Sequence, residues 1–322
     1  MATALCASVR YSLNVNRNLQ PPVYPGLPKA LMASTIRTES HEGCGVAILG
    51  APDDLGVRLN GGRAGACDGP RAFRDALARY GVASPHGWEW PLVYDAGDII
   101  PSQGSDAKAL QETHRRVTEV TAWLLGLGML PIMIGGGHDL TYPFVRAVTQ
   151  AAGPMSGLYL DAHLDVRDTI GSGMPFRRLI EDCGVTGLHL HGLNPLVNAD
   201  DHVRWFQEHG GIIHGRMDAP QDDLVRRVVG KSLFVSLDLD VLDASHAPGV
   251  SALNASGWST REVERVVTAA GRDPRVLCFD IMELCPPHDV AGRTARVAAH
   301  MFLSFLRGVA QRPAVHHPGP RP

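Results

Sequence analysis

The chain has 322 residues and a mass of 34.6 kDa, enough for one large α/β domain or two ordinary domains. Hydrophobic residues make up 44% and charged residues 20%, a globular composition that excludes a disordered chain. The 30 basic and 33 acidic residues give a formal net charge of −3, which excludes a strong pull toward nucleic acid or an anionic membrane, so we expect a small-molecule partner.

The apolar runs are too short for a membrane protein. The longest, Val120–Ile134, is interrupted by two glycines and Pro131, whereas a spanning helix needs ~20 apolar residues. We therefore expect no membrane association. The six cysteines form neither a C-x-x-C pair nor a metal-binding spacing, which predicts reduced, mostly buried thiols and a cytoplasmic location.

Both ends of the chain differ in composition from the middle. Residues 1–40 carry no acid before Glu39 and include a proline-rich stretch, so we predict a disordered extension there. Two alternatives stay open: a transit peptide, or sequence upstream of a start at Met32. The last residues, 311–322, contain four prolines and are predicted to be a disordered tail, which leaves residues 41–310 for the folded domain.

Between these ends, short apolar segments alternate with amphipathic segments, the pattern of strands followed by helices. In chain order, we predict strand Val46–Gly50, helix Pro70–Tyr80, strand Leu92–Tyr94, helix Ala107–Leu125, strand Met129–Ile134, helix Tyr142–Ala152, strands Leu158–Leu160 and Leu188–Leu190, helix Asp200–Glu208, strand Ile212–His214, helix Asp222–Val229, strand Leu233–Leu237, a helix opening at Ser259, strand Val276–Phe279 and helix Ala291–Leu306. Ser259 and Glu262 form a capping-box signature.

This alternation predicts the fold class. Continuously apolar strands separated by helices indicate a mostly parallel sheet that is covered on both faces. About eight strands without a linker between them favour a single three-layer α/β/α domain. In such sheets ligands bind beyond the carboxyl ends of the strands, so polar residues that follow a strand are the candidates for a functional site.

Three predicted strands are followed by acidic residues, and two of these segments also contain histidine: Gly135–Asp139, Asp161–Asp165 and Ser236–Asp240. Side chains at i, i+2 and i+4 of an extended segment share a face, so the acids and histidines within each segment project together. The candidate ligands are His138, Asp161, His163, Asp165, Asp238 and Asp240. Four converging carboxylates would repel one another without cations. Oxygen ligands with two imidazoles and no thiolate suit a pair of Mn²⁺ ions better than a structural zinc.

At these residues the sequence resembles the ureohydrolases, the arginase and agmatinase superfamily of dinuclear manganese enzymes. The matching segments include the glycine run before His138, Asp161–Asp165, Ser236–Asp243 and Asp280–Glu283, and the likeness extends over roughly residues 43–308. The resemblance implies an arginase-like fold, two Mn²⁺ ions per subunit and a homo-oligomer.

Within the superfamily the chain is most similar to the formimidoylglutamase branch, which acts in histidine degradation. Three segments carry this similarity: Asn60–Ala66, Ser172–Arg177 and Ala247–Ala252. In the second, Phe176 occupies a stretch where members that cleave guanidines usually carry a histidine. The resemblance implies hydrolysis of N-formimino-L-glutamate to L-glutamate and formamide.

The resemblance also implies roles for individual residues. His138, Asp161, Asp165 and Asp238 would hold one manganese, and Asp161, His163, Asp238 and Asp240 the other, with Asp161 and Asp238 bridging. Asp165 would accept a hydrogen bond from the attacking oxygen. Glu283 would bind the amidine-like nitrogens.

A substrate derived from glutamate carries two carboxylates, which require cationic or polar partners. Arg177 and Arg63 are the predicted carboxylate ligands, because a guanidinium group binds a carboxylate through two parallel hydrogen bonds, and Asn60 is predicted to line the same site. Arg178 and Arg58 are weaker candidates. His246 is a hypothetical proton donor in place of the histidine that Phe176 replaces.

Three other functions remain to be distinguished. The same metal site could cleave a guanidino compound and release urea, as in agmatinase, guanidinobutyrase or arginase. A deacetylase of related fold would need a single zinc and a tandem histidine pair in the pocket, and His316-His317 lie in the tail. A non-enzyme would normally have lost some ligands, whereas all six are present.

Overall fold

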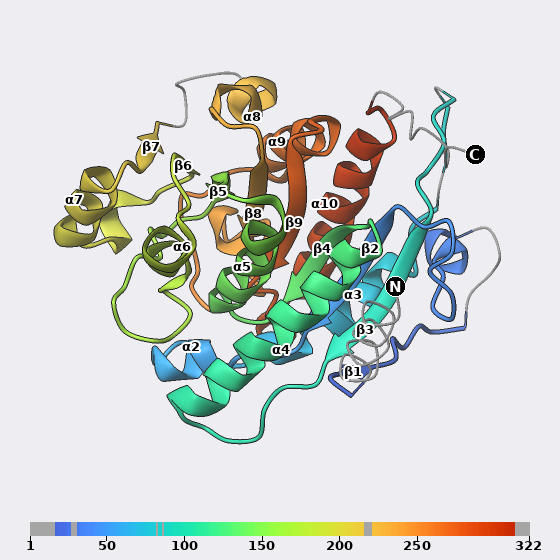
Figure 1. Cartoon of the computed structure of the whole chain (residues 1–322), viewed down its shortest axis with the longest axis horizontal. Coiled ribbons are helices and arrows are strands. Elements are labelled where there is room, and N and C mark those ends of the chain that lie inside the picture. Colours follow the sequence, from blue (N-terminus) through green and yellow to red (C-terminus); the bar gives the residue numbers. More distant parts are fainter. Residues whose placement is uncertain (1–16, 27–30, 82, 86, 216–220, 313–322) are drawn as a thin grey trace, which may run out of the picture.

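The computed structural model describes residues 17–26, 31–81, 83–85, 87–215 and 221–312. Within these residues nine strands form one sheet in the order β1-β3-β2-β4-β9-β8-β5-β6-β7, in which only β1 is antiparallel to its neighbour (Figure 1). The strands are β1 Leu19–Gln20, β2 Val46–Ala51, β3 Val93–Ile99, β4 Leu130–Gly135, β5 Ser156–Leu160, β6 Leu188–His191, β7 Ile212–His214, β8 Leu233–Asp238 and β9 Val276–Met282. The predicted mostly parallel α/β sheet is confirmed.

Helices cover both faces of this sheet. The α-helices are α2 Leu55–Leu59, α3 Gly69–Leu77, α4 Ala107–Gly126, α5 Thr141–Ala152, α6 Pro175–Cys183, α7 Asp200–Glu208, α8 Leu224–Arg227, α9 Thr260–Arg272 and α10 Arg293–Val309. Helices α4, α5 and α6 pack against one another on one face, and α3, α9 and α10 lie on the other (Figure 1). The capping box predicted at Ser259 and Glu262 is present at the start of α9.

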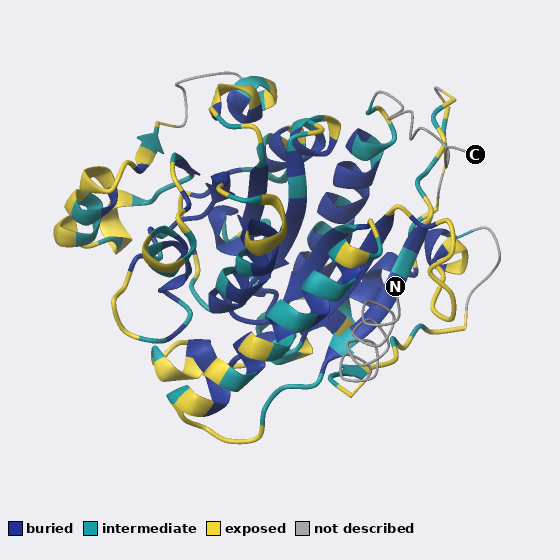
Figure 2. Ribbon diagram, in the orientation of Figure 1, coloured by how far each residue is buried: buried dark blue, intermediate teal, exposed yellow. Residues whose placement is uncertain are grey.

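Each central strand is apolar on both faces, which is why the sequence shows continuous apolar runs rather than alternation. In β2, Val46 and Ile48 pack with α3, α9 and α10, whereas Ala47 and Leu49 pack with α4 and α5. Figure 2 shows the result: the central strands are buried between helices whose outer faces are exposed, whereas the edge strand β7 is partly exposed. The core is therefore two apolar layers separated by the sheet.

Most strand boundaries lie within three residues of the predictions, but β3 extends to Ile99, five residues beyond the predicted end, and one short strand and two α-helices were missed. Strand β1 has two residues and pairs Leu19 with Ile99 at the sheet edge. Helix α2 has five residues, too few for a helical period to be visible. Helix α6 begins inside the segment Ser172–Arg177, which was not predicted to be helical, and its two consecutive arginines obscure the apolar face.

The prediction of a disordered extension over 1–40 is wrong for the described part of that segment. Tyr24 packs against the core, and Met32 is 1% exposed within the cluster formed by α3 and α10. Residues 1–16 and 27–30, and residues 313–322 of the tail, lie outside the described residues. No described helix has the length and apolarity needed to cross a bilayer. Five of the six cysteines lie in the described part, and all five are free.

A buried ion pair ties α3 to β3, the strand next to the edge strand β1. Arg74 is 1% exposed. Its guanidinium binds both oxygens of Asp95, with Nε 2.8 Å from Oδ2 and Nη2 2.9 Å from Oδ1. The third nitrogen, Nη1, lies 2.6 Å from Asp98 Oδ1. The hydroxyl of Tyr24 donates to the same Asp95 carboxylate at 2.7 Å. Because Asp95 is fully buried, its charge depends on these donors.

We expect Arg74→Met to lower the free energy of unfolding by about 3–5 kcal/mol, because it leaves the Asp95 carboxylate buried without its cation. Urea denaturation measures the change. Arg115→Gln is the control: Arg115 pairs with Glu112 and Glu119 on the exposed face of α4, and its loss should cost less than about 1 kcal/mol. Equal effects of the two substitutions would contradict this account.

Candidate active site

Four neighbouring strands at the middle of the sheet bring the predicted site together. Strands β4, β9, β8 and β5 are adjacent and parallel, so their carboxyl ends meet at the same edge. His138 follows β4, Glu283 follows β9, Asp238 ends β8, and Asp161 begins the loop after β5. The chain order of these strands differs from their spatial order, and the sheet topology alone makes them neighbours.

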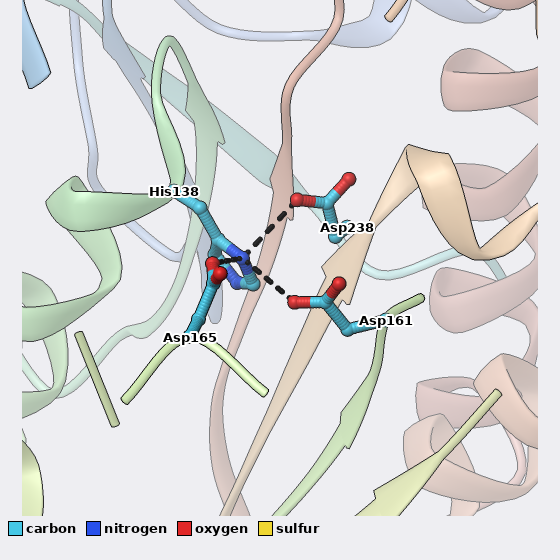
Figure 3. A group of neighbouring side chains, drawn as sticks. All are labelled: His138, Asp161, Asp165 and Asp238. Atoms are coloured by element: carbon cyan, nitrogen blue, oxygen red, sulfur yellow. Dashed lines mark ion pairs between the residues drawn. The ribbon is translucent and has the colours of Figure 1, made fainter. Parts of the chain in front are cut away.

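Three carboxylates surround the imidazole ring of His138 (Figure 3). Its Nδ1 lies 3.1 Å from Asp161 Oδ2, 3.0 Å from Asp165 Oδ2 and 3.1 Å from Asp238 Oδ2. Neither His138 Nδ1 nor Asp161 Oδ2 has a hydrogen-bond partner among the residues that the structure describes, although both atoms are buried. One ring nitrogen facing three carboxylate oxygens is an arrangement that requires a cation.

A second group lies beside the first and shares Asp161 with it. His163 Nδ1 lies 2.9 Å from Asp240 Oδ2 and 3.5 Å from Asp161 Oδ1. The two oxygens of Asp161 therefore face different groups, as a bridging carboxylate requires. Asp238 is placed by geometry in the first group, and its Oδ1 accepts the Asp240 N–H at 2.7 Å; its predicted bridging role stays a prediction.

The electrostatics of the two groups also indicate a need for positive charge. Burial, together with the carboxylates of Asp165 and Asp240, raises the pKa of Asp161 to about 6. Burial and the neighbouring Asp240 and Asp161 raise the pKa of Asp238 well above its usual value. Divalent cations remove this repulsion, and oxygen ligands with two imidazoles are the donor set that Mn²⁺ accepts. The residues present thus fit a dinuclear manganese centre.

Side chains behind the ligands fix the orientation of His138. The other ring nitrogen, Nε2, lies 3.0 Å from Ser236 Oγ, and that hydroxyl donates to Asp280 Oδ1 at 2.5 Å. The ring of Phe176 packs edge-on against the imidazole, with a centroid separation of 5.2 Å. These partners leave His138 Nδ1 as the only ring atom available to the cluster.

Glu283 sits next to the first group with both carboxylate oxygens held. Oε1 accepts the backbone N–H of His138 at 2.9 Å, and Oε2 accepts the hydroxyl of Ser251 at 2.6 Å. Burial raises the pKa of Glu283 to about 7. Glu283 and Asp165 are two of only three described non-glycine residues with positive φ, at 64° and 49°. Strained backbone at both predicted catalytic positions is characteristic of a functional site.

A pocket of about 140 Å³ opens above these groups. Its lining includes Asn60, Arg167, Ser172 and Ser251 in addition to Glu283 and four of the predicted metal ligands. Asn60 thus lies where the sequence placed it. Arg167 was missed, although it follows Asp165 by two residues in a segment already assigned to the site. Its guanidinium makes no ion pair or hydrogen bond with any residue that the structure describes.

The two arginines predicted to bind substrate lie elsewhere, and these assignments need correction. Arg177 is on α6, where it pairs with Glu181 at 2.9 Å and stacks over the ring of Trp205 at 4.4 Å. Arg63 donates to the backbone oxygens of Val250 and Ser251, at 2.6 and 2.9 Å, and so braces a pocket loop from outside. Neither guanidinium lines the pocket.

The remaining weaker candidates also have structural partners. Arg178 contacts Glu181 and the backbone oxygen of Asp168, and Arg58 pairs with Asp54. His246 Nδ1 lies 3.0 Å from Thr260 Oγ1, outside the pocket lining, so its position does not suit proton donation to substrate. Phe176 is fully buried under His138 and does not line the pocket either.

Comparison with known proteins gives a consistent picture. The arginase family profile matches residues 44–307. A formimidoylglutamase of Aromatoleum aromaticum is 35% identical, with 84% of each chain covered. The human mitochondrial guanidino acid hydrolase is 28% identical over 86% of this chain and 81% of its own length. The crystal structure of Trypanosoma cruzi formiminoglutamase with Mn²⁺ superimposes with a TM-score of 0.79 and 32% identity, covering 87% of this chain and 98% of that one.

We expect purified protein dialysed against Mn²⁺ to retain two ions per chain and to unfold at a higher temperature than protein treated with EDTA, because the ions bind only the folded cluster. Asp238→Asn should retain fewer ions, since it removes a charged oxygen that faces His138 Nδ1. Atomic absorption and thermal denaturation measure both effects.

Asp243→Asn is the control, because Asp243 lies five residues further on and accepts the Ser245 N–H outside both groups. It should retain two ions per chain. Loss of an ion in this variant, or two ions in Asp238→Asn, would contradict the assignment of the cluster.

Proposed function

The chain belongs to the arginase family, and on this basis we propose that it hydrolyses the C–N bond of a formimino amino acid, N-formimino-L-glutamate, to give L-glutamate and formamide. The observation that carries the proposal is the pair of carboxylate–imidazole groups joined through Asp161, at the floor of a pocket that also holds Glu283 and Arg167. Sequence similarity to formimidoylglutamases over most of the chain supports this choice of substrate.

The cofactor of the reaction is a pair of Mn²⁺ ions, which the T. cruzi formiminoglutamase structure also carries. His138, Asp161, Asp165 and Asp238 would hold one ion, and His163 and Asp240 would join Asp161 in holding the other. When bound, the two ions supply Lewis acidity that makes water a nucleophile near neutral pH.

Glu283 is assigned to the formimino nitrogens of the substrate. Its carboxylate lies beside the cluster and is already oriented by the His138 N–H and the Ser251 hydroxyl, so it can accept further hydrogen bonds without reorganising. An amidinium presents two N–H groups in a plane, and a carboxylate matches them as in an arginine–carboxylate pair. This interaction would place the formimino carbon over the metal ligands.

Asp165 is assigned the role of accepting the proton of the attacking water. Its side chain is 15% exposed, lines the pocket and keeps one oxygen at 3.0 Å from His138 Nδ1. The second oxygen can accept a hydrogen bond from the nucleophile and orient it toward the substrate carbon. The proton that Asp165 accepts from this water would pass to the α-amine of glutamate as the C–N bond breaks, so that glutamate and formamide are both released.

Arg167 is assigned to a substrate carboxylate in place of Arg177 and Arg63. It is the cation that lines the pocket, and its guanidinium lies on the same side as Asn60, which hydrogen-bonds Ser172 at 3.0 Å. Hydrogen bonds from a guanidinium to a carboxylate would fix the far end of the substrate while Glu283 holds the formimino end.

A guanidino-acid hydrolase that releases urea is the second candidate, favoured by the 28% identity to the human guanidino acid hydrolase. A guanidino acid also has a carboxylate for Arg167 and a planar cation for Glu283. Phe176 and Arg177, which distinguish the two substrates in sequence, both lie outside the pocket lining and therefore do not decide between them.

Product analysis separates these functions. We expect manganese-loaded protein to release formamide and glutamate from N-formimino-L-glutamate, and no urea from arginine, agmatine or 4-guanidinobutyrate. If one of the guanidines releases urea and N-formimino-L-glutamate releases no formamide, the metal site would stand and the proposed substrate would be refuted. Manganese binding without turnover of any of the four would indicate a non-catalytic protein.

Arg167→Met should raise KM for N-formimino-L-glutamate at least about tenfold with a smaller change in kcat, because it removes one charged hydrogen-bonding partner and leaves the metal ligands intact. Arg177→Met removes a guanidinium of the same type from outside the pocket and should leave KM within about twofold. Steady-state kinetics of both variants test the assignment. A larger effect from Arg177→Met would reverse it.

We also propose a place for the enzyme in histidine degradation, a cytoplasmic location and a homo-oligomeric state. The five free cysteines support a reducing compartment. Light scattering and cell fractionation test the last two statements.

A further inference from the structure

Asp139 is the acid of the glycine–histidine segment that the metal site does not use. It follows His138 directly, is fully buried and does not line the pocket. Its Oδ2 lies 2.7 Å from Nε2 of His114, a residue on α4 that is itself 3% exposed, and its Oδ1 has no hydrogen-bond partner in the described part of the chain. A buried carboxylate with one side-chain donor depends on that donor for its position.

The carboxylate of Asp139 is packed closely against its neighbours. An added Cβ at Gly56 of α2 would stand 1.9 Å from Asp139 Oδ1, and one at Gly137 would stand 2.8 Å from the same atom. The carboxylate thus packs against two bare glycine backbones, between α2 and the turn that carries His138. Helix α4 closes the third side through His114. Asp139 therefore fixes the distance between three elements that meet at the site.

The turn held in this way positions two functional groups. The backbone of Gly136 and Gly137 donates to Ala51 and Asp53 at 3.1 and 2.9 Å, and Gly136 accepts the Glu283 N–H at 2.9 Å. His138, the next residue, supplies the ring nitrogen of the first ligand group and the N–H that holds Glu283 Oε1. A shift of Asp139 would therefore move a metal ligand and the amidine-binding carboxylate together.

We propose that His114 is a positioning residue of the manganese centre, which acts through its hydrogen bond to Asp139 to hold the Gly136–His138 turn in register with the ligands on β5 and β8. Its own backbone is held in turn, because its carbonyl accepts from Thr118 Oγ1 at 3.1 Å and from Arg146 Nη2 at 3.3 Å. His114 lines neither the pocket above the cluster nor the cluster itself; it borders a separate cavity together with Tyr142 and Arg146. Its role in metal binding is independent of substrate, whereas its effect on Glu283 rests on the proposed function.

The test compares two amide side chains at position 114. In His114→Gln the amide nitrogen occupies nearly the place of Nε2 and can donate to Asp139, whereas in His114→Asn it is one methylene too short. Removal of such outer partners typically costs 10–100-fold in metal affinity. We expect the Asn variant to raise the Kd for Mn²⁺ by about 10–100-fold and the Gln variant to stay within about threefold of wild type.

Electron paramagnetic resonance of free Mn²⁺, titrated against the full chain, measures Kd without any substrate. Thr113→Val is the matched control: Thr113 is the preceding residue of α4, is 1% exposed and accepts the Ser102 N–H at 3.0 Å, away from the site. It should lower the unfolding temperature and leave the Kd unchanged. If His114→Asn does not fold, two other variants test the proposal. His114→Gln and Asp139→Asn must then both retain wild-type affinity for Mn²⁺, since the asparagine at position 139 keeps an oxygen for His114.

An unchanged Kd in folded His114→Asn would reduce His114 to a structural residue and overturn the proposal. Equal weakening in the Asn and Gln variants would also overturn it, because the hydrogen bond would then not be the cause. Since these titrations contain no substrate, failure of the proposed hydrolysis would leave their outcome intact, and the two failures can be told apart.

Discussion

Mutual repulsion among four carboxylates at one edge of the sheet is the constraint on which the rest of this structure depends. Asp161, Asp165, Asp238 and Asp240 lie within reach of two imidazole rings, and all but Asp165 are buried. Within the described part of the chain, the buried atoms His138 Nδ1 and Asp161 Oδ2 have no hydrogen-bond partner. Two divalent cations resolve the conflict, and the fold supplies the rigidity that keeps the carboxylates together.

That rigidity comes from the middle of the sheet, where ligands follow strands buried on both faces. The turn before His138 is held on one side by the end of β2 and on the other by Glu283, and it approaches them so closely that a Cβ at Gly136 would stand 1.9 Å from the Asp53 carbonyl oxygen. Glycine is required there because backbone meets backbone. Positive φ at Asp165 and Glu283 shows that the same scaffold also holds two functional residues in strained conformations.

The arginines of this chain have different roles in different environments, some at the site and others in support of the fold. Arg74 is buried to anchor α3 to β3, Arg177 stacks on Trp205, Arg63 braces the loop of Ser251, and Arg167 alone of these lines the pocket. Phe176 supports the His138 ring from below rather than facing a substrate. The substrate specificity of this site therefore depends on the pocket wall around Asn60 and Arg167, and the metal affinity on the residues behind His138.

The sequence by itself determined the alternation of strands and helices, the parallel sheet and the six residues of the two ligand groups, because apolar runs and the i, i+2 spacing of acids after a strand are local properties. Only the tertiary structure decided which arginine lines the pocket, since Arg177 is on a helix that turns it toward Trp205 whereas Arg167 is in the loop. It also placed Met32 in the core and paired His114 with Asp139. Those contacts join residues 25 or more positions apart, and no local pattern in a sequence encodes such a distance.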